Sequence, residues 1–335
     1  MRKSPVALDL TGIGNVNEFY SHHYLDALLE GDLKGLLSRW DQAEEEENRT
    51  PPHKALSRCS EDYFKAKARA ATTATVEDRF TEGHPINVRL AEALGYPYQS
   101  GEYELIEGDL AVPVLAALKR DGNPYLWLVE APWADEDHEP LKQRLTDEQG
   151  SKSEAFRDGH KFPFEVWEDL LSLIFRREEP PRWVILLAGS LIFLVERHKW
   201  GQGKYLLFDI DQILGRKQAD ALKATAALLS RDSLCPEDGT VLHDTLDDNS
   251  HKHAFAVSGD LKYGLRRAVE LLANEYVWYQ RNVTKQALFG DDEVARKLTV
   301  EALTYLYRLL FLLYAEARGD EVGVLPMKSD EYREG

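Results

Sequence analysis

The stretch YLWLVEAPW, Tyr125 to Trp133, decides how this chain folds. Its apolar run is typical of a strand that is buried on both faces of a sheet. The run ends in one carboxylate, Glu130, and Pro132 follows two residues later. The first question about this chain is therefore what a carboxylate at the end of a buried strand contacts.

Length and charge limit the class of protein. A chain of 335 residues is long for one domain and predicts two or three units, each with enough core to fold. It has 41 Lys and Arg residues against 58 Asp and Glu residues, a formal charge of -17. Because phosphates attract dense basic charge, this balance opposes DNA binding by the surface as a whole. A DNA contact needs a local basic patch, or another part of a larger protein.

Cysteine usage and the N-terminus favour a cytoplasmic protein. Cys59 and Cys235 lie far apart without Cys-x-x-Cys or Cys/His spacing, which argues against a disulfide framework or a zinc module. The N-terminus lacks the apolar core of a signal peptide. The most apolar helix, near Leu298 to Tyr314, contains Arg308 and is expected to be a core helix, so we expect no membrane partner.

The apolar pattern divides the chain into three regions. Residues 1–75 are predicted to form an N-terminal helical arm, because FYSHHYLDALLEGDLKGLLSRW has apolar residues near helical spacing, with Gly31 as a possible break. Residues 76–216 are predicted to form an α/β domain. Residues 217–335 are predicted to form a helical region. The EEEE run at Glu44 to Glu47 is interpreted as a solvated helix end.

The middle region alternates short helices and strands. INVRLAEALGY is predicted to be a helix that Gly95 ends, and FEVWEDLLSLIF a second helix. The strand candidates are YELIEGDLAVPVLAAL, PYLWLVEA, RWVILLAG, LIFLVER and KYLLFDI. The predicted fold class is therefore α/β, with a mixed sheet flanked by N-terminal and C-terminal helical regions.

The acidic residues of this region follow the order of the PD-(D/E)xK nuclease core: a helix, an acidic residue on a strand, then a second strand that ends in an acidic residue. Asp109 and Glu130 occupy the two carboxylate positions, which in such a core hold Mg²⁺. Pro132 stands where the water-activating lysine belongs, and it has neither a charge nor a donor. Lys119 and Lys142 are the candidates to replace that lysine from elsewhere. The alternative is that Glu130 is an ordinary surface residue at the rim of the sheet, with no catalytic role.

Long phrases of the C-terminal half carry a family resemblance. They are PRWVILLAGSLIFLVERHKWGQGKYLLFDIDQILGRK, LSRDSLCPEDGTVLHDTLDDNSHKHAFAVSGDLKYGLRRAVELLANE, EALTYLYRLLFLLYAEARG and LPMKSDEYREG. From about Val16 to its last residue the chain resembles the N-terminal third of large type IIG-like restriction-modification proteins. It looks closest to the adenine DNA methyltransferase of DISARM-type phage-defence systems. The resemblance implies a PD-(D/E)xK-like domain, with Asp109 and Glu130 at its acidic positions, and helices that lead into a methyltransferase domain.

Motifs for methyl transfer are missing from this chain. An adenine methyltransferase holds the flipped base with an (N/D/S)PP(Y/F/W) motif, whereas GNPYLW at Gly122 to Trp127 lacks the second proline and precedes a strand. TGIG at Thr11 to Gly14 is interpreted as a flexible segment rather than a nucleotide loop. S-adenosylmethionine is therefore expected only for a methyltransferase domain outside this chain, which is a fragment of a longer protein or the product of a split gene.

Two polar clusters complete the list of candidate sites. LHDTLDDNSHKHAF contains His243, His251 and His253 beside several aspartates, but we interpret it as a polar loop that opens a helix and expect no metal site there. A set of basic residues on one helix is the candidate DNA-binding site, and we call it the basic set. Because Glu270 and Glu275 lie among these residues, the alternative is a surface of salt bridges. The basic set consists of Lys262, Arg266, Arg267, Arg281 and Lys285.

Three functions remain open. The preferred one is a non-catalytic, nuclease-like N-terminal module of a phage-defence adenine DNA methyltransferase, which engages DNA or other defence subunits. The second is an active Mg²⁺-dependent DNA endonuclease domain that uses Asp109 and Glu130; Mg²⁺ would be its only cofactor. The third is a free-standing structural or interaction protein with the same fold.

Overall fold

The structure is a computed structural model. It describes residues 9–21, 24–25, 29–106, 110–133, 139–143, 145, 166–237, 239–285 and 292–317. Contacts divide the chain into two compact units, residues 1–251 and residues 252–335. This division lies C-terminal to both of the predicted boundaries, 75 and 216.

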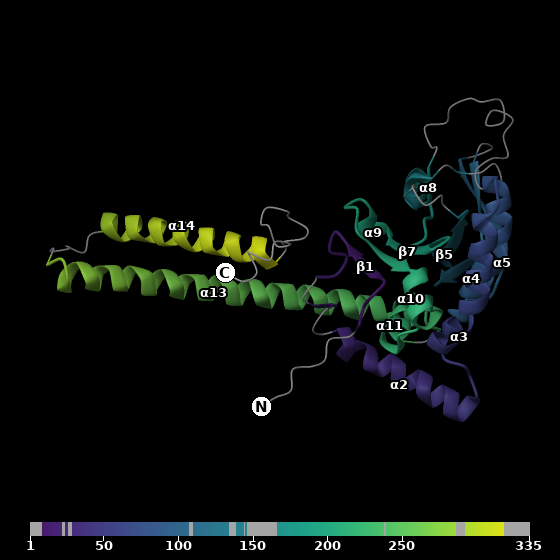
Figure 1. The fold of residues 1–335 in the computed structure, drawn as a ribbon, viewed down its shortest axis with the longest axis horizontal. Helices are drawn as coiled ribbons and strands as arrows, with labels where there is room; N and C mark the ends of the chain where they lie inside the picture. The colour runs from purple at the N-terminus through teal and green to yellow at the C-terminus, as the bar shows by residue number, and fades with distance from the viewer. Residues whose placement is uncertain are drawn as a thin grey trace. The chain divides into compact units, whose positions relative to one another are not determined.

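Unit 1 contains the strands and most of the helices (Figure 1). Its strands are β1 (Ile13–Val16), β2 (Gly101–Ile106), β3 (Leu110–Val114), β4 (Ala116–Arg120), β5 (Asn123–Ala131), β6 (Trp183–Ala188), β7 (Leu191–Glu196) and β8 (Tyr205–Asp209). Its helices are α2 (Leu29–Glu47), α3 (Pro52–Arg58), α4 (Ser60–Ala71), α5 (Val76–Ala93), the 3₁₀ turn η1 (Pro140–Lys142), α8 (Trp167–Arg176), α9 (Arg197–Trp200), α10 (Ile210–Arg216), α11 (Ala219–Leu229) and α12 (Arg231–Leu234). Helix α13 (Leu242–Asn282) begins in unit 1, and α14 (Asp292–Ala317) belongs to unit 2.

The fold is α/β, as predicted, with a six-stranded mixed sheet in the order β1-β8-β7-β6-β5-β4. Strands β5 and β6 pair in parallel, and the other neighbours pair antiparallel. The parallel pair needs a crossover connection, in which the predicted helix α8 lies. YELIEGDLAVPVLAAL, predicted to be strand-like, contributes three strands: β2 and β3 form a separate two-stranded sheet, and β4 joins the main one.

Both faces of the sheet are covered, as the unbroken apolar runs predict. On one face, Leu126 and Leu128 of β5 pack in a large core with side chains of α2, α3, α4, α5, α10 and α11. On the other face, Trp127 and Val129 pack with side chains of α8 and β3. Because side chains alternate along a strand, Glu130 lies on the first face, towards α5.

The N-terminal region is part of the same core rather than a separate arm. The prediction of a flexible segment at TGIG is wrong, because β1 begins at Ile13 and pairs with β8. Helix α2 runs through Gly31 without a break and ends at Glu47, where the acidic run was expected to end a helix. The large core also includes Leu33, Tyr63 and Leu228, although they come from regions that were predicted to be separate.

The segment LHDTLDDNSHKHAF is helical, so the prediction of a polar loop is wrong: α13 begins at Leu242. His243 is buried, with Nδ1 2.6 Å from the Tyr20 hydroxyl and Nε2 2.7 Å from the carbonyl oxygen of Leu228. A carbonyl only accepts, so Nε2 donates and Nδ1 accepts from Tyr20. Burial lowers the pKa of His243 to about 4 and keeps the ring neutral at neutral pH. This buried histidine fixes the start of α13 to the core.

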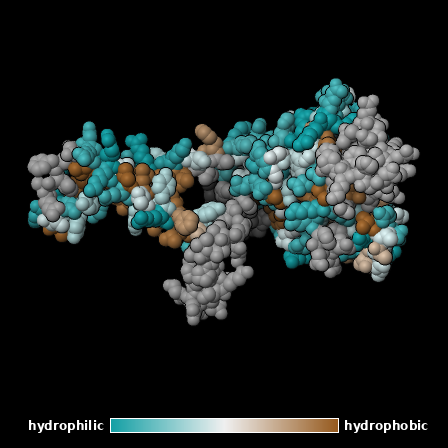
Figure 2. All heavy atoms as spheres, turned by 90° about the horizontal axis from the view of Figure 1, so that it is seen from above, coloured by the Kyte–Doolittle hydropathy of each residue, from teal (hydrophilic) through white to brown (hydrophobic). Residues whose placement is uncertain are grey.

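Helix α14 is apolar enough, by length and composition alone, to cross a membrane. Its expected role as a core helix is not observed: among the described residues of α14, only Ala302 and Ala315 are buried. Figure 2 shows brown apolar side chains open to solvent on the helical lobe at its left. Unit 2 therefore exposes a surface that sequence reasoning places in a core.

Candidate functional site

Glu130 lies next to the last residue of β5, in register with Leu187 of the parallel strand β6. It is 6% exposed, which is rare for a carboxylate unless hydrogen bonds compensate for the lost water. Two such bonds come from α5. The Nδ1 atom of His84 lies 2.6 Å from Oε1, and the amide of Asn87 donates to Oε2 at 3.0 Å.

The partners of Glu130 are three residues apart on α5, so both side chains project from one face of that helix. Thr75 caps α5 by accepting from the backbone N–H of Asp78, which fixes where the helix begins. The hydrogen bond to Glu130 raises the pKa of His84 above its ordinary value, against a smaller opposing effect of burial. Asn87 is buried, whereas His84 is partly open to water. Helix and strand together form a polar clamp, Glu130, His84 and Asn87, at the edge of the apolar core.

Trp133 occupies the space beyond the strand end. It follows Pro132, is buried, and stacks at a tilt against Tyr63 with ring centroids 5.4 Å apart. Two glycines make room for it. A Cβ atom on Gly83 would come within 2.6 Å of the indole Nε1, and one on Gly189, whose φ is +62°, within 3.1 Å of the Trp133 Cα. The APW sequence thus closes the end of β5 with an indole ring.

Neither lysine proposed to replace the missing one lies at the clamp. Lys119 pairs in register with Pro124, which puts it about 20 Å along β5 from Glu130 at ~3.3 Å per residue. Lys142 pairs with Glu139 beside Leu141, a residue that packs on the α8 face of the sheet, opposite the clamp. Neither Lys119 nor Lys142 is therefore placed to replace the missing lysine beside Glu130.

Asp109, the other predicted carboxylate, lies outside the described residues, so its pairing with Glu130 stays a prediction. Strand β3, which begins at the next residue, belongs to the two-stranded sheet. Its residues Val112 and Val114 pack with Trp127 on the α8 face.

The basic set lies in and just after the C-terminal half of α13. All five side chains are exposed, and Lys285 follows the end of the helix. Arg266 pairs with Glu270 at 3.0 Å one turn later, as the interleaved acids predict. Because the set remains exposed, it is open to a phosphate backbone.

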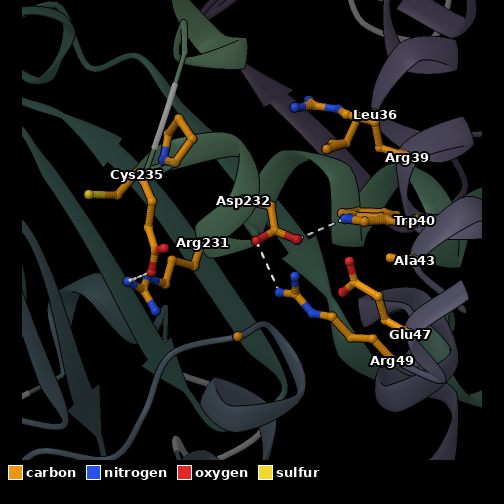
Figure 3. A pocket seen from close by; sticks show the side chains of 12 residues that line it. Leu36, Arg39, Trp40, Ala43, Glu47, Arg49, Arg231, Asp232 and Cys235 are labelled. Carbon is orange, nitrogen blue, oxygen red and sulfur yellow. Dashed lines mark hydrogen bonds and ion pairs between the residues drawn. The ribbon is translucent and has the colours of Figure 1, made fainter.

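No group of three or more possible metal-ligating side chains is found among the described residues. A charged cavity of ≈350 Å³ lies between α2 and α12 (Figure 3). There Asp232 accepts from the indole N–H of Trp40 at 2.9 Å and from Arg49 at 3.3 Å, and Arg231 pairs with Glu237. Since these charges neutralise one another, the cavity favours neither an anion nor a cation.

His84 and Asn87 are the site residues that sequence reasoning missed. The signal was present as GHPIN, two polar residues three apart, of which Asn87 shares the buried face of α5 with Ile86 and Leu90. Such a pair predicts a buried polar contact, but only the packing of α5 against β5 identifies Glu130 as its partner.

Comparison of this chain with protein-family models, with curated proteins and with solved structures finds no match in any of the three.

Proposed function

We propose that this chain is the non-catalytic, nuclease-like N-terminal module of a phage-defence adenine DNA methyltransferase, and that it helps to engage DNA or partner subunits in the cytoplasm. The clamp is the observation that supports a module without catalytic activity. Both oxygens of Glu130 accept hydrogen bonds from α5, and Trp133 closes the strand end. A carboxylate used in this way stabilises the fold and is poorly placed to hold a hydrated Mg²⁺ ion.

The order of elements supports the nuclease-like part of the proposal. Helix α5 precedes strands β2, β3 and β4, and β5 then brings a carboxylate, Glu130, to its end. Glu130 contacts that same helix. The missing lysine supports loss of cleavage, because Pro132 supplies no cation and neither Lys119 nor Lys142 lies near the clamp.

The engagement of DNA rests on the basic set of α13. A protein of formal charge -17 gains phosphate contacts only where basic side chains gather, and these five are exposed. Five neutralised phosphates would give a salt slope no steeper than about -4.5 on a log–log plot. We therefore expect weak, non-specific and strongly salt-dependent binding.

Fluorescence anisotropy with a labelled DNA duplex at two salt concentrations tests whether the basic set binds DNA. The double substitution Arg266→Glu and Arg267→Glu is expected to weaken binding and to make the salt slope shallower by about two. Lys65→Glu, which reverses an exposed charge on α4, is the matched control and should change little. Equal affinities for the α13 double variant and the control would refute DNA engagement through the basic set.

A further inference from the structure

Helix α14 has two different faces. Half-buried or buried residues recur every fourth position at Val294, Leu298, Ala302, Leu306 and Leu310, and mark the packed face, although Tyr305 and Leu309 on the same side remain exposed. The opposite face carries Val300, Thr304, Tyr307 and Phe311 at spacings of four, three and four residues. At ~100° per residue, this second set lies about 180° from the first. We call Val300, Thr304, Tyr307 and Phe311 the open seam.

The open seam has the composition of an interface core. Val300, Tyr307 and Phe311 are 58%, 61% and 58% exposed. A spacing of three and four residues is the pattern by which two helices interlock side chains along one line. A concave surface of ≈570 Å³ follows the same face, lined by Thr304, Tyr307, Arg308, Phe311 and Leu312. Apolar surface of this extent on an exposed helix is typical of an interaction site.

Two charged residues beside the open seam indicate which partner binds there. Glu301 and Arg308 are exposed, lie seven residues apart, and flank the seam on the same side. No ion pair is found for either of them among the described residues. When two copies of α14 pack antiparallel about a two-fold axis near Thr304, Glu301 of each copy faces Arg308 of the other. A two-fold axis forms this pair twice.

We propose that the open seam of α14 is a homodimer interface, in which two copies of the chain pack antiparallel and exchange the Glu301 and Arg308 ion pair. The exposed apolar area of Val300, Tyr307 and Phe311 is about 300 Å² per copy, taking ~150–250 Å² for a large side chain. A standard interface buries ~800 Å² per partner, polar rim included. We therefore expect a dimer of micromolar affinity, formed independently of any nuclease-like role.

A second copy fits this surface better than a lipid bilayer does. A membrane-spanning helix would place Glu301 and Arg308 in the hydrocarbon core, where each ionised side chain costs ~2.5–3.5 kcal/mol. In the antiparallel dimer these same two residues neutralise one another at the rim. The two flanking charges therefore favour the dimer.

Sedimentation velocity of the whole chain from about 1 to 100 µM tests the proposal. The sedimenting mass should rise from that of a 38.2 kDa monomer towards twice that value. Phe311→Glu should weaken the dimer at least about tenfold, because it buries an unpaired carboxylate of each copy in the apolar seam. Tyr263→Glu, at an exposed aromatic position of α13, is the matched control and should leave the dimer intact. Circular dichroism checks that each variant is folded.

Charge exchange distinguishes this geometry from non-specific association. Arg308→Glu alone should weaken the dimer, because two glutamates then face each other, and adding Glu301→Arg should restore it. A chain that stays monomeric throughout the range, a dimer insensitive to Phe311→Glu, or a double variant without recovery would each overturn the proposal. Retention of the monomeric chain on phosphatidylcholine vesicles would also overturn it, in favour of a membrane contact.

Discussion

Replacing Glu130 by alanine is expected to lower the free energy of unfolding by about 2–3 kcal/mol. The substitution leaves the buried amide of Asn87 without its acceptor and removes the hydrogen bond to His84. Urea unfolding followed by circular dichroism measures the loss. Glu237→Ala is the matched control, since it removes an exposed glutamate that pairs with Arg231, and should cost less than about 1 kcal/mol.

The pH dependence of this variant provides a second test of the clamp. The pKa of His84 is raised in the folded chain, so the folded state binds its proton more tightly than the unfolded state does. The stability from this pair is therefore fully present below pH 6.5, the ordinary pKa, and is lost as the pH rises through the folded value. Glu130→Ala should abolish that part of the pH dependence. A stability cost equal to that of Glu237→Ala, with an unchanged pH profile, would show that the clamp is not formed.

Gly83→Ala is expected to destabilise the chain by about 1–3 kcal/mol, although alanine favours helix over glycine by ~1 kcal/mol. The added methyl would lie 2.6 Å from the indole nitrogen of Trp133, so the ring or helix α5 has to shift. Gly35→Ala is the matched control, because this glycine of α2 has nothing within 4 Å of the added atom. It should stabilise the chain by about 0.5–1 kcal/mol.

Thermal or urea unfolding of both glycine variants gives the comparison. The difference in sign between two identical substitutions isolates the packing of Trp133 from helix propensity. If Gly83→Ala stabilises the chain as Gly35→Ala does, Trp133 does not close the end of β5.

The main strands and helices around Glu130 could be predicted because each is specified locally. The apolar runs of β5 to β8 indicate a sheet covered on both faces, and Gly95, with φ +89°, ends the predicted helix α5 within two residues. Strand β1 was missed because TGIGNV is short and rich in glycine, and it becomes a strand only by pairing with β8. Local pattern does not contain that long-range contact.

Of the site, Glu130 could be predicted from the sequence and its two partners could not. Glu130 stands out as a charge in an apolar run, but its partners come from an element more than forty residues earlier in the chain, which spacing alone does not specify. The exposure of α14 was missed for a related reason: an apolar helix has the same sequence pattern whether its cover lies in the same chain or in a partner. His243 shows the reverse case, a histidine in a polar segment that tertiary packing buries.

Incubation of supercoiled plasmid with the purified chain and Mg²⁺ or Mn²⁺ tests most directly the claim that Glu130 is a structural acceptor rather than a metal ligand. The expected result is that the plasmid stays supercoiled, with the wild-type chain and Glu130→Gln indistinguishable from a reaction without protein. Metal-dependent nicking by the wild-type chain that disappears in a folded Glu130→Gln variant would contradict this account and establish an active endonuclease.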